Sequence, residues 1–243
     1  MFKRIDQLKM QLDSQRPLPE SVVKNLHEDL ILRWTYNSNA IEGNTLTLLE
    51  TKVVLEGITI GGKSLREHFE AINHRDAIVF VEELVQKREA LSEWDIRNIH
   101  QLILKNIDDE NAGRYCPLNV LIAGARHTPP DHLLVQEKMA KFIANYRVNT
   151  MHPVEQAARV HVDFVAIHPF VDDNGRCARL IMTLELMKSG YPPLVISVEQ
   201  RLRYYQALDS AHVDGNYQPF IELVVEAVEQ SFAPYFFALG IGH

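Results

Sequence analysis

Apolar residues recur along most of this chain at the spacing of a single α-helical face. One stripe runs along residues 22–34, at Val22, Leu26, Leu30 and Trp34. Another runs along residues 154–165, at Val154, Ala158, Val162 and Val165. Side chains three or four positions apart lie on the same face of a helix, so each stripe can be buried against a neighbouring helix. The pattern predicts an all-α fold of packed amphipathic helices.

Residues 113–130 interrupt the helical pattern. They contain three prolines, two glycines and the short apolar run Val120, Leu121 and Ile122. A short apolar run bounded by turn residues is typical of a strand. We therefore predict a loop that carries a small β-hairpin.

Local signals mark several helix ends. Gly43 and Asn44 tolerate the left-handed backbone conformation, so a helix is expected to stop there. Thr47 followed by Glu50 is a capping-box pattern, which predicts the start of another helix. Ser92 precedes a further predicted helix in the same way.

No repeat and no obvious linker divides the chain. We expect residues 61–243 to form the core domain and residues 1–60 to form an N-terminal helical extension packed on it. Trp34 and Trp94 are expected to anchor the core.

Charge and cysteine content narrow the classes of partner. The net charge of −7 over 243 residues argues against general nucleic-acid binding. Two cysteines are too few for a disulfide framework, which favours a reducing compartment. Neither an apolar signal region nor a segment long enough to cross a bilayer is visible. We therefore expect a cytoplasmic protein with no nucleic-acid or membrane partner.

The most informative segment is residues 168–179, which read HPFVDDNGRCAR. A helix should end before Pro169, because the residue before a proline disfavours the α conformation. A new helix is expected to begin near Gly175, so a short polar loop leads into a helix N-terminus. The free N–H groups and the helix dipole at such an end attract anions.

The side chains of this segment suit phosphate chemistry. Arg176 and Arg179 are three positions apart and share a helix face, so both can reach one anion. Asp172 offers a hard oxygen ligand for Mg²⁺ beside phosphates. His168 titrates near neutral pH and can act as a base. We interpret the segment as a nucleotide phosphate site; the alternative is a solvated polar turn followed by surface arginines.

The segment resembles the signature of the Fic family, HPFx(D/E)GNGRxxR. It matches at every defined position but one, where Asp173 replaces a glycine. Upstream, Ser38 and Glu42 are similar to the family's inhibitory motif, (S/T)xxxE(G/N), which here precedes the core as an N-terminal inhibitory helix. Gly113 and the residues after it resemble the approach to the family's β-hairpin flap.

The resemblance implies a helical Fic core that transfers AMP from Mg-ATP to a hydroxyl of a target protein. His168 would take the proton from a Tyr, Ser or Thr of the target, and Asp172 would hold Mg²⁺. The flap, at Leu121, Ile122 and Ala123, would dock the target chain as an added strand.

The resemblance also assigns residues to the nucleotide. Asn174 and Gly175 would cradle phosphate, Arg176 would contact the phosphates and Arg179 would hold the γ-phosphate. Three residues near the far end of the core are candidates to border the nucleotide base: Tyr204, Tyr205 and His212.

Glu42 would pair with Arg179 and keep ATP out of productive geometry, with Ser38 on the same helix face. In some relatives the equivalent glutamate also serves the removal of AMP, so both addition and removal of AMP stay open. A homodimer is compatible with the family.

The alternative function is a degenerate nucleotide-binding module without transfer activity, which Asp173 alone favours. A phosphoryl transferase of the Doc branch is disfavoured, because that branch has a lysine where this chain has Gly175.

Overall fold

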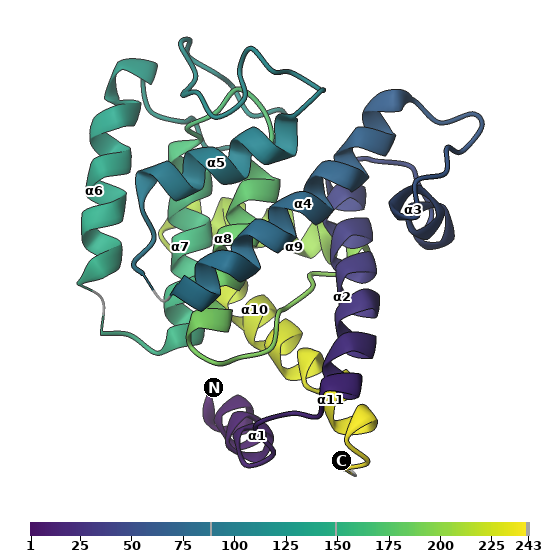
Figure 1. Ribbon diagram of the computed structural model, residues 1–243. Coiled ribbons are helices and arrows are strands. Elements are labelled where there is room, and N and C mark those ends of the chain that lie inside the picture. Colours follow the sequence, from purple (N-terminus) through teal and green to yellow (C-terminus); the bar gives the residue numbers. More distant parts are fainter. Residues whose placement is uncertain (88, 149, 242–243) are drawn as a thin grey trace.

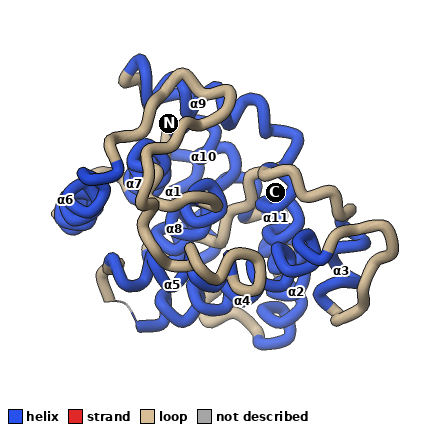
Figure 2. The backbone as a smooth tube through the Cα atoms, turned by 90° about the horizontal axis from the view of Figure 1, so that it is seen from above, coloured by secondary structure: helices blue, strands red, loops and turns tan. Residues whose placement is uncertain are grey.

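The chain folds into helices joined by loops, as Figure 1 and Figure 2 show. The computed structural model describes residues 1–87, 89–148 and 150–241, and none of these residues forms a strand. The α-helices are α1 (Lys3–Asp13), α2 (Glu20–Ile41), α3 (Leu48–Leu55), α4 (Leu65–Lys87), α5 (Glu93–Leu104), α6 (Val135–Arg147), α7 (Pro153–Ile167), α8 (Asn174–Lys188), α9 (Arg201–Asp214), α10 (Gln218–Ser231) and α11 (Ala233–Ala238). Short 3-10 helices at His132–Leu134 and Val198–Gln200 lead into α6 and α9. The prediction of an all-α fold is confirmed.

Helix α8 runs through the middle of the molecule, with α7 beside it and α4 and α5 packed across it (Figure 1). Every side chain from residue 176 to residue 186 is buried. The middle of α8 is mostly apolar, with only Thr183 and Glu185 as polar exceptions, as expected for a helix that neighbours surround. The first two turns of this central helix carry Arg176 and Arg179, so the fold places two cations inside the protein.

The first two helices belong to the same hydrophobic core as the rest of the chain. Ile5 and Leu12 of α1 and Trp34 and Ile41 of α2 are buried in one cluster with α7 and α8. Helix α1 contacts α10, and α11 contacts α2, so both chain ends lie at one end of the molecule (Figure 1). The proposed division of the chain at residue 60 stays a prediction.

The predicted helix ends agree with the structure. Helix α2 stops at Ile41, and Gly43 adopts a φ of 100° in the turn that follows. Thr47 and Glu50 form a capping box at the start of α3, and Ser92 forms another at the start of α5. Each box satisfies N–H groups that the first helical turn leaves without partners.

The predicted β-hairpin is wrong for residues 113–130, which form an irregular loop. A hairpin needs paired strands, whereas the apolar run ends in a turn, in which the N–H of Ala125 donates to the carbonyl of Ile122. Leu121 is 85% exposed. The loop is instead attached to α9, where Arg126 forms ion pairs with Asp209 and Asp214.

One of the two predicted core tryptophans is misassigned. Trp34 is buried, as expected, but Trp94 is 64% exposed and packs edge-on against Phe80. Trp94 lies in the first turn of α5, where it faces away from the central helix.

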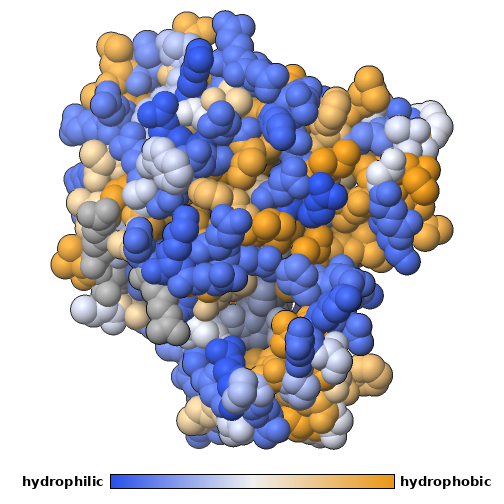
Figure 3. Space-filling model, viewed as in Figure 1, coloured by the Kyte–Doolittle hydropathy of each residue, from blue (hydrophilic) through white to orange (hydrophobic). Residues whose placement is uncertain are grey.

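The visible surface is mostly hydrophilic (Figure 3), with apolar side chains gathered over α3, where Leu49 is exposed. No helix in the described part of the chain combines the length and the hydropathy that crossing a membrane requires.

Candidate functional site

The loop between α7 and α8 is shaped by its own residues and by α5. His168 ends α7 with a φ of 51°, and Asp173 precedes α8 with a φ of 60°. The side-chain amide of Asn174 closes the loop: Oδ1 accepts from the N–H of Phe170 at 3.0 Å, and Nδ2 donates to its carbonyl at 2.8 Å. From α5, His100 stacks on Phe170 with ring centroids 3.7 Å apart.

His100 connects this loop with the loop that begins at Gly113. Its Nδ1 accepts from the N–H of Gly113 at 2.9 Å, so its Nε2 carries the proton and donates to the carbonyl of Asp172 at 3.2 Å. Burial lowers the pKa of His100 to about 4, so the ring is neutral. Its role is to position the loop.

Asp173, the residue that departs from the signature, points into the protein. Its carboxylate pairs with the guanidinium of Arg176, and Asp173 is only 5% exposed. Burial raises the pKa of Asp173 to about 6. Arg176 is also buried and bonds to Asn39 Oδ1 at 3.0 Å, while its Nη2 lies 3.5 Å from Glu70 Oε1. The extra negative charge is therefore matched by a buried cation.

Arg179 has protein partners for each of its guanidinium nitrogens. Its Nη2 lies 2.8 Å from Glu42 Oε1 and donates to the carbonyl of Ser38 at 2.9 Å. Its Nε donates to Ser38 Oγ at 3.0 Å, and its Nη1 donates to the hydroxyl of Tyr204 at 3.2 Å. Burial alone would lower the pKa of Arg179, but Tyr204 and Glu42 outweigh burial and raise it. The residue is a permanent cation held by α2 and α9.

The last turn of α2 delivers Ser38 and Glu42 to this arginine. Ser38 is buried, and Glu42 directly follows Ile41, the last residue of the helix. The hydroxyl of Tyr205 donates to the carbonyl of Ile41 at 3.2 Å and holds this helix end. The Glu42 carboxylate rests against Gly175, at the α8 N-terminus where an anion is favoured.

His168 carries a neutral imidazole at neutral pH. Burial lowers its pKa below the usual value for histidine. It lies within four residues of Asp172, whose side chain is half exposed. Burial raises the pKa of Asp172, but the N–H of Asp173 and the Arg66 guanidinium outweigh burial and hold that pKa below its usual range.

The donor set at Asp172 fits a metal ion that a phosphate compound brings with it. No cluster of three or more metal-ligating side chains occurs among the described residues. Mg²⁺ characteristically binds through one or two carboxylates together with substrate phosphates and water. A single exposed carboxylate beside an anion-binding helix end meets that requirement.

The three candidates for the nucleotide base lie in different surroundings. Tyr204 is buried, and its hydroxyl lies between Arg179 and Nε2 of His161. Tyr205 is 40% exposed. His212 bonds to the carbonyl of Val162, and its ring lies 4.8 Å from that of His127, at the base of the irregular loop.

Four residues of this site carry no signal in the sequence. They are Asn39, Arg66, Glu70 and His100. Each belongs to a helix other than α8, and only Asn39 lies within a motif, at an undefined position between Ser38 and Glu42. Asn39 adjoins Ser38, which is the one hint that its side chain shares the buried helix face.

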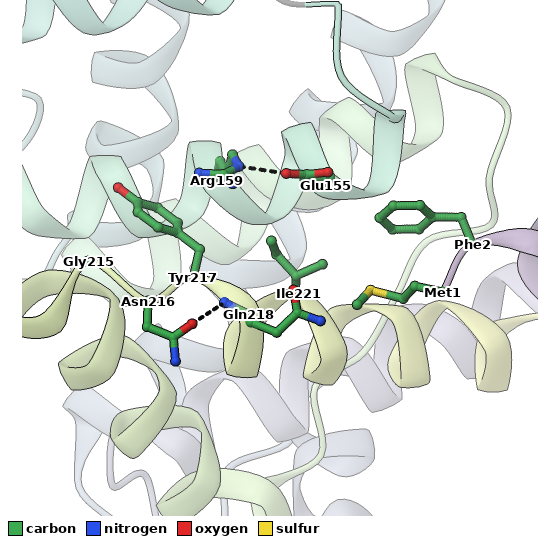
Figure 4. A pocket seen from close by; sticks show the side chains of 9 residues that line it. All are labelled: Met1, Phe2, Glu155, Arg159, Gly215, Asn216, Tyr217, Gln218 and Ile221. Carbon is green, nitrogen blue, oxygen red and sulfur yellow. Dashed lines mark hydrogen bonds and ion pairs between the residues drawn. The ribbon is translucent and has the colours of Figure 1, made fainter.

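Two cavities help to delimit the site. A pocket of about 380 Å³ lies at the start of α10 (Figure 4), and His168 is not among its lining residues. Its Arg159 is paired with Glu155 at 2.9 Å and stacks over Tyr217, so its charge is already matched. A much smaller cavity of about 10 Å³ borders Arg179 and Ser38, room for about one water molecule.

Comparisons with known proteins agree on one family. The model of the Fic/DOC family matches residues 90–186. The protein adenylyltransferase Fic of Nematostella vectensis is 35% identical over 97% of this chain and 55% of its own length. That of Drosophila erecta is 32% identical over 97% of this chain and 48% of its own. The chain thus spans about half the length of the curated relatives it matches.

Solved structures extend this likeness to the fold. A Fic domain containing signaling protein from Bacteroides thetaiotaomicron superposes with a TM-score of 0.90 at 29% identity, over 99% of this chain and 98% of its own. Fic-1, residues 134–508, from C. elegans gives a TM-score of 0.88 at 32% identity, over 98% of this chain and 72% of its own.

Proposed function

The chain belongs to the Fic/DOC family, and on this premise we propose that it is a protein adenylyltransferase. The observation that carries the proposal is the arrangement around the α8 N-terminus. A neutral histidine, an exposed carboxylate and a buried arginine converge there within twelve residues of sequence. The curated relatives are named for this activity.

In the proposed reaction the target hydroxyl oxygen attacks the α-phosphorus of ATP. A new oxygen–phosphorus bond forms, and the bond to the pyrophosphate leaving group breaks. His168 accepts the hydroxyl proton, and its lowered pKa supports this role because the ring is neutral at pH 7. Bound Mg²⁺, held by Asp172, would neutralise phosphate charge.

The phosphates would bind at the first turn of α8. The N–H groups around Asn174 and Gly175 point outward there, and Asp173 makes no side-chain cap that would occupy them. Arg179 would anchor the γ-phosphate. Arg176 is buried and paired with Asp173, so its positive charge would stabilise the phosphates electrostatically without contacting them.

We further propose that the resting state is autoinhibited. Glu42 now pairs with Arg179 and occupies the helix end that the γ-phosphate needs, and the 2.8 Å ion pair supports this. ATP could still bind, but with its γ-phosphate displaced. Ser38 contributes two hydrogen bonds that hold the arginine toward α2.

The remaining assignments follow from the family. Tyr205 and His212 are proposed to border the adenine, and Tyr204 to support Arg179. Leu121, Ile122 and Ala123 are proposed to dock the target, and the exposure of Leu121 supports this. Homodimer formation, a cytoplasmic location and AMP removal stay predictions.

Incubation with α-labelled ATP and a candidate target mixture tests the proposal. The Glu42→Gly variant should label protein, and the additional change His168→Ala should abolish labelling while ATP binding remains. Nucleotide binding without labelling by Glu42→Gly would select the alternative, a degenerate binding module. Asp173 is the residue that favours this alternative. Its support is weaker because the carboxylate is paired with Arg176.

A further inference from the structure

Asp172 is already bound by a cation of the protein itself. The Nη2 atom of Arg66, in the first turn of α4, lies 2.8 Å from Asp172 Oδ2. The two residues are 106 positions apart in the sequence. Both side chains are about half exposed, at 55% and 53%, so the pair is open to solvent and to exchange with dissolved ions.

The two carboxylate oxygens of Asp172 have different partners. Oδ1 accepts from the N–H of Asp173 at 2.8 Å, a bond that belongs to the loop and helps to shape it. Oδ2 accepts from Arg66 Nη2. Oδ2 is therefore the oxygen that a metal ion would use, and it is the oxygen that Arg66 covers.

We propose that Arg66 is a built-in counter-cation of Asp172, which a divalent metal ion must displace before the site can bind a metal nucleotide. The inference rests on the proposed function, in which Asp172 holds Mg²⁺. Two cations cannot share Oδ2 at contact distance, because their mutual repulsion adds to the loss of the existing bond. Arg66 thus raises the Mg²⁺ concentration that the site requires.

A second anchor keeps the displaced arginine nearby. The Nε atom of Arg66 lies 3.1 Å from Oε1 of Glu70, one turn further along α4. Glu70 is buried, and its Oε2 accepts from Asn44 at 2.8 Å, so it stays in place when Arg66 moves. The guanidinium can leave Asp172 without leaving the site.

The same arginine has the opposite effect on a nucleotide without metal. An arginine near the first turn of α8 attracts phosphate charge when no Mg²⁺ is present. Removal of Arg66 should therefore weaken metal-free nucleotide binding and strengthen metal-bound nucleotide binding. An exposed ion pair contributes about 1 kcal/mol at most, which corresponds to about fivefold in affinity.

The test is calorimetric titration of the full chain with ADP, in EDTA and in saturating Mg²⁺. The measured quantity is the affinity for ADP in Mg²⁺ divided by the affinity for ADP in EDTA. In Arg66→Gln this ratio should be up to about fivefold higher than in the wild type. The ratio for Arg66→Lys should lie between those of the wild type and Arg66→Gln. Arg203→Gln is the matched control, because Arg203 is a similarly exposed arginine paired with Glu226 and should leave the ratio unchanged.

Asp172→Asn separates this inference from the proposed function. If Mg²⁺ still strengthens ADP binding to Asp172→Asn, or if the wild type binds no ADP, the proposed metal site is wrong and this inference falls with it. If Asp172→Asn loses the Mg²⁺ effect but Arg66→Gln shows the wild-type ratio or a lower one, only the role of Arg66 is overturned.

Discussion

The carboxylate of Glu42 rests directly on Gly175, so closely that a Cβ atom at position 175 would overlap Glu42 Oε1. The protein thus carries an anion of its own at the N-terminus of α8, with Arg179 on its other side. A glycine at position 175 is what makes the approach feasible. This contact joins the end of α2 to the first turn of the central helix and underlies the first two predictions.

Glu42→Gly should increase AMP self-labelling more than tenfold. The change frees Arg179 for the γ-phosphate, and a tenfold gain corresponds to about 1.4 kcal/mol in the barrier. Labelling with α-labelled ATP over time measures the rate. Asp29→Asn, which removes an exposed ion pair elsewhere on α2, should have no effect. Equal labelling by Glu42→Gly and wild type would rule out inhibition, and adding Arg179→Ala should remove the gain.

Ser38→Ala should activate labelling only partly, by about fivefold or less. The variant loses the hydrogen bond from Arg179 Nε to Ser38 Oγ, whereas the bond to the Ser38 carbonyl remains. A hydrogen bond of this kind contributes about 1 kcal/mol. The same time course measures the effect. Full activation, equal to that of Glu42→Gly, would contradict the primary role given to the ion pair.

Asp173→Gly should lower the free energy of unfolding by about 2 kcal/mol or more. Glycine relieves roughly 1 kcal/mol of left-handed backbone strain. Against this, loss of one partner from a buried ion pair costs about 3–5 kcal/mol. Urea unfolding measures the difference. A variant more stable than the wild type would mean that strain, and not the pair with Arg176, dominates.

Asp173→Gly should also tighten ATP binding in the Glu42→Gly background. We do not expect the Asp173 carboxylate to repel phosphate strongly, because it is buried and paired with Arg176. Its removal releases the Arg176 guanidinium, which gains freedom to meet phosphate. Calorimetry with Mg-ATP measures the affinity, and weaker binding by the double variant would contradict this account.

Labelling by Glu42→Gly should stay constant from pH 7 upward and decline in acid with an apparent pKa below 6.5. Burial lowers the pKa of His168, so the neutral base persists at pH values where an ordinary histidine is half protonated. Asp173, with a pKa raised to about 6, titrates in the same range. The Asp173→Asn variant should keep the acid limb. An acid limb that disappears with Asp173 would assign it to that carboxylate.

Much of the fold was predictable because the signals are local. The end of α2 at Ile41 and the capping boxes at Thr47 and Ser92 depend on residues a few positions apart. Interactions of that range are encoded in short stretches of sequence. The hairpin prediction failed because a strand exists only where a second strand pairs with it, and residues 113–130 have no such partner.

The sequence by itself determined the helical class, the loop that enters α8, and which residue types gather there. Only the tertiary structure decided which partner each charged side chain contacts. Asp173 could face a phosphate, water or a buried cation, and the packing of α8 among its neighbours turned it toward Arg176. Arg66 meets Asp172 across 106 positions because α4 crosses α8. Both pairs depend on how the helices pack, and local sequence cannot specify which charges will meet.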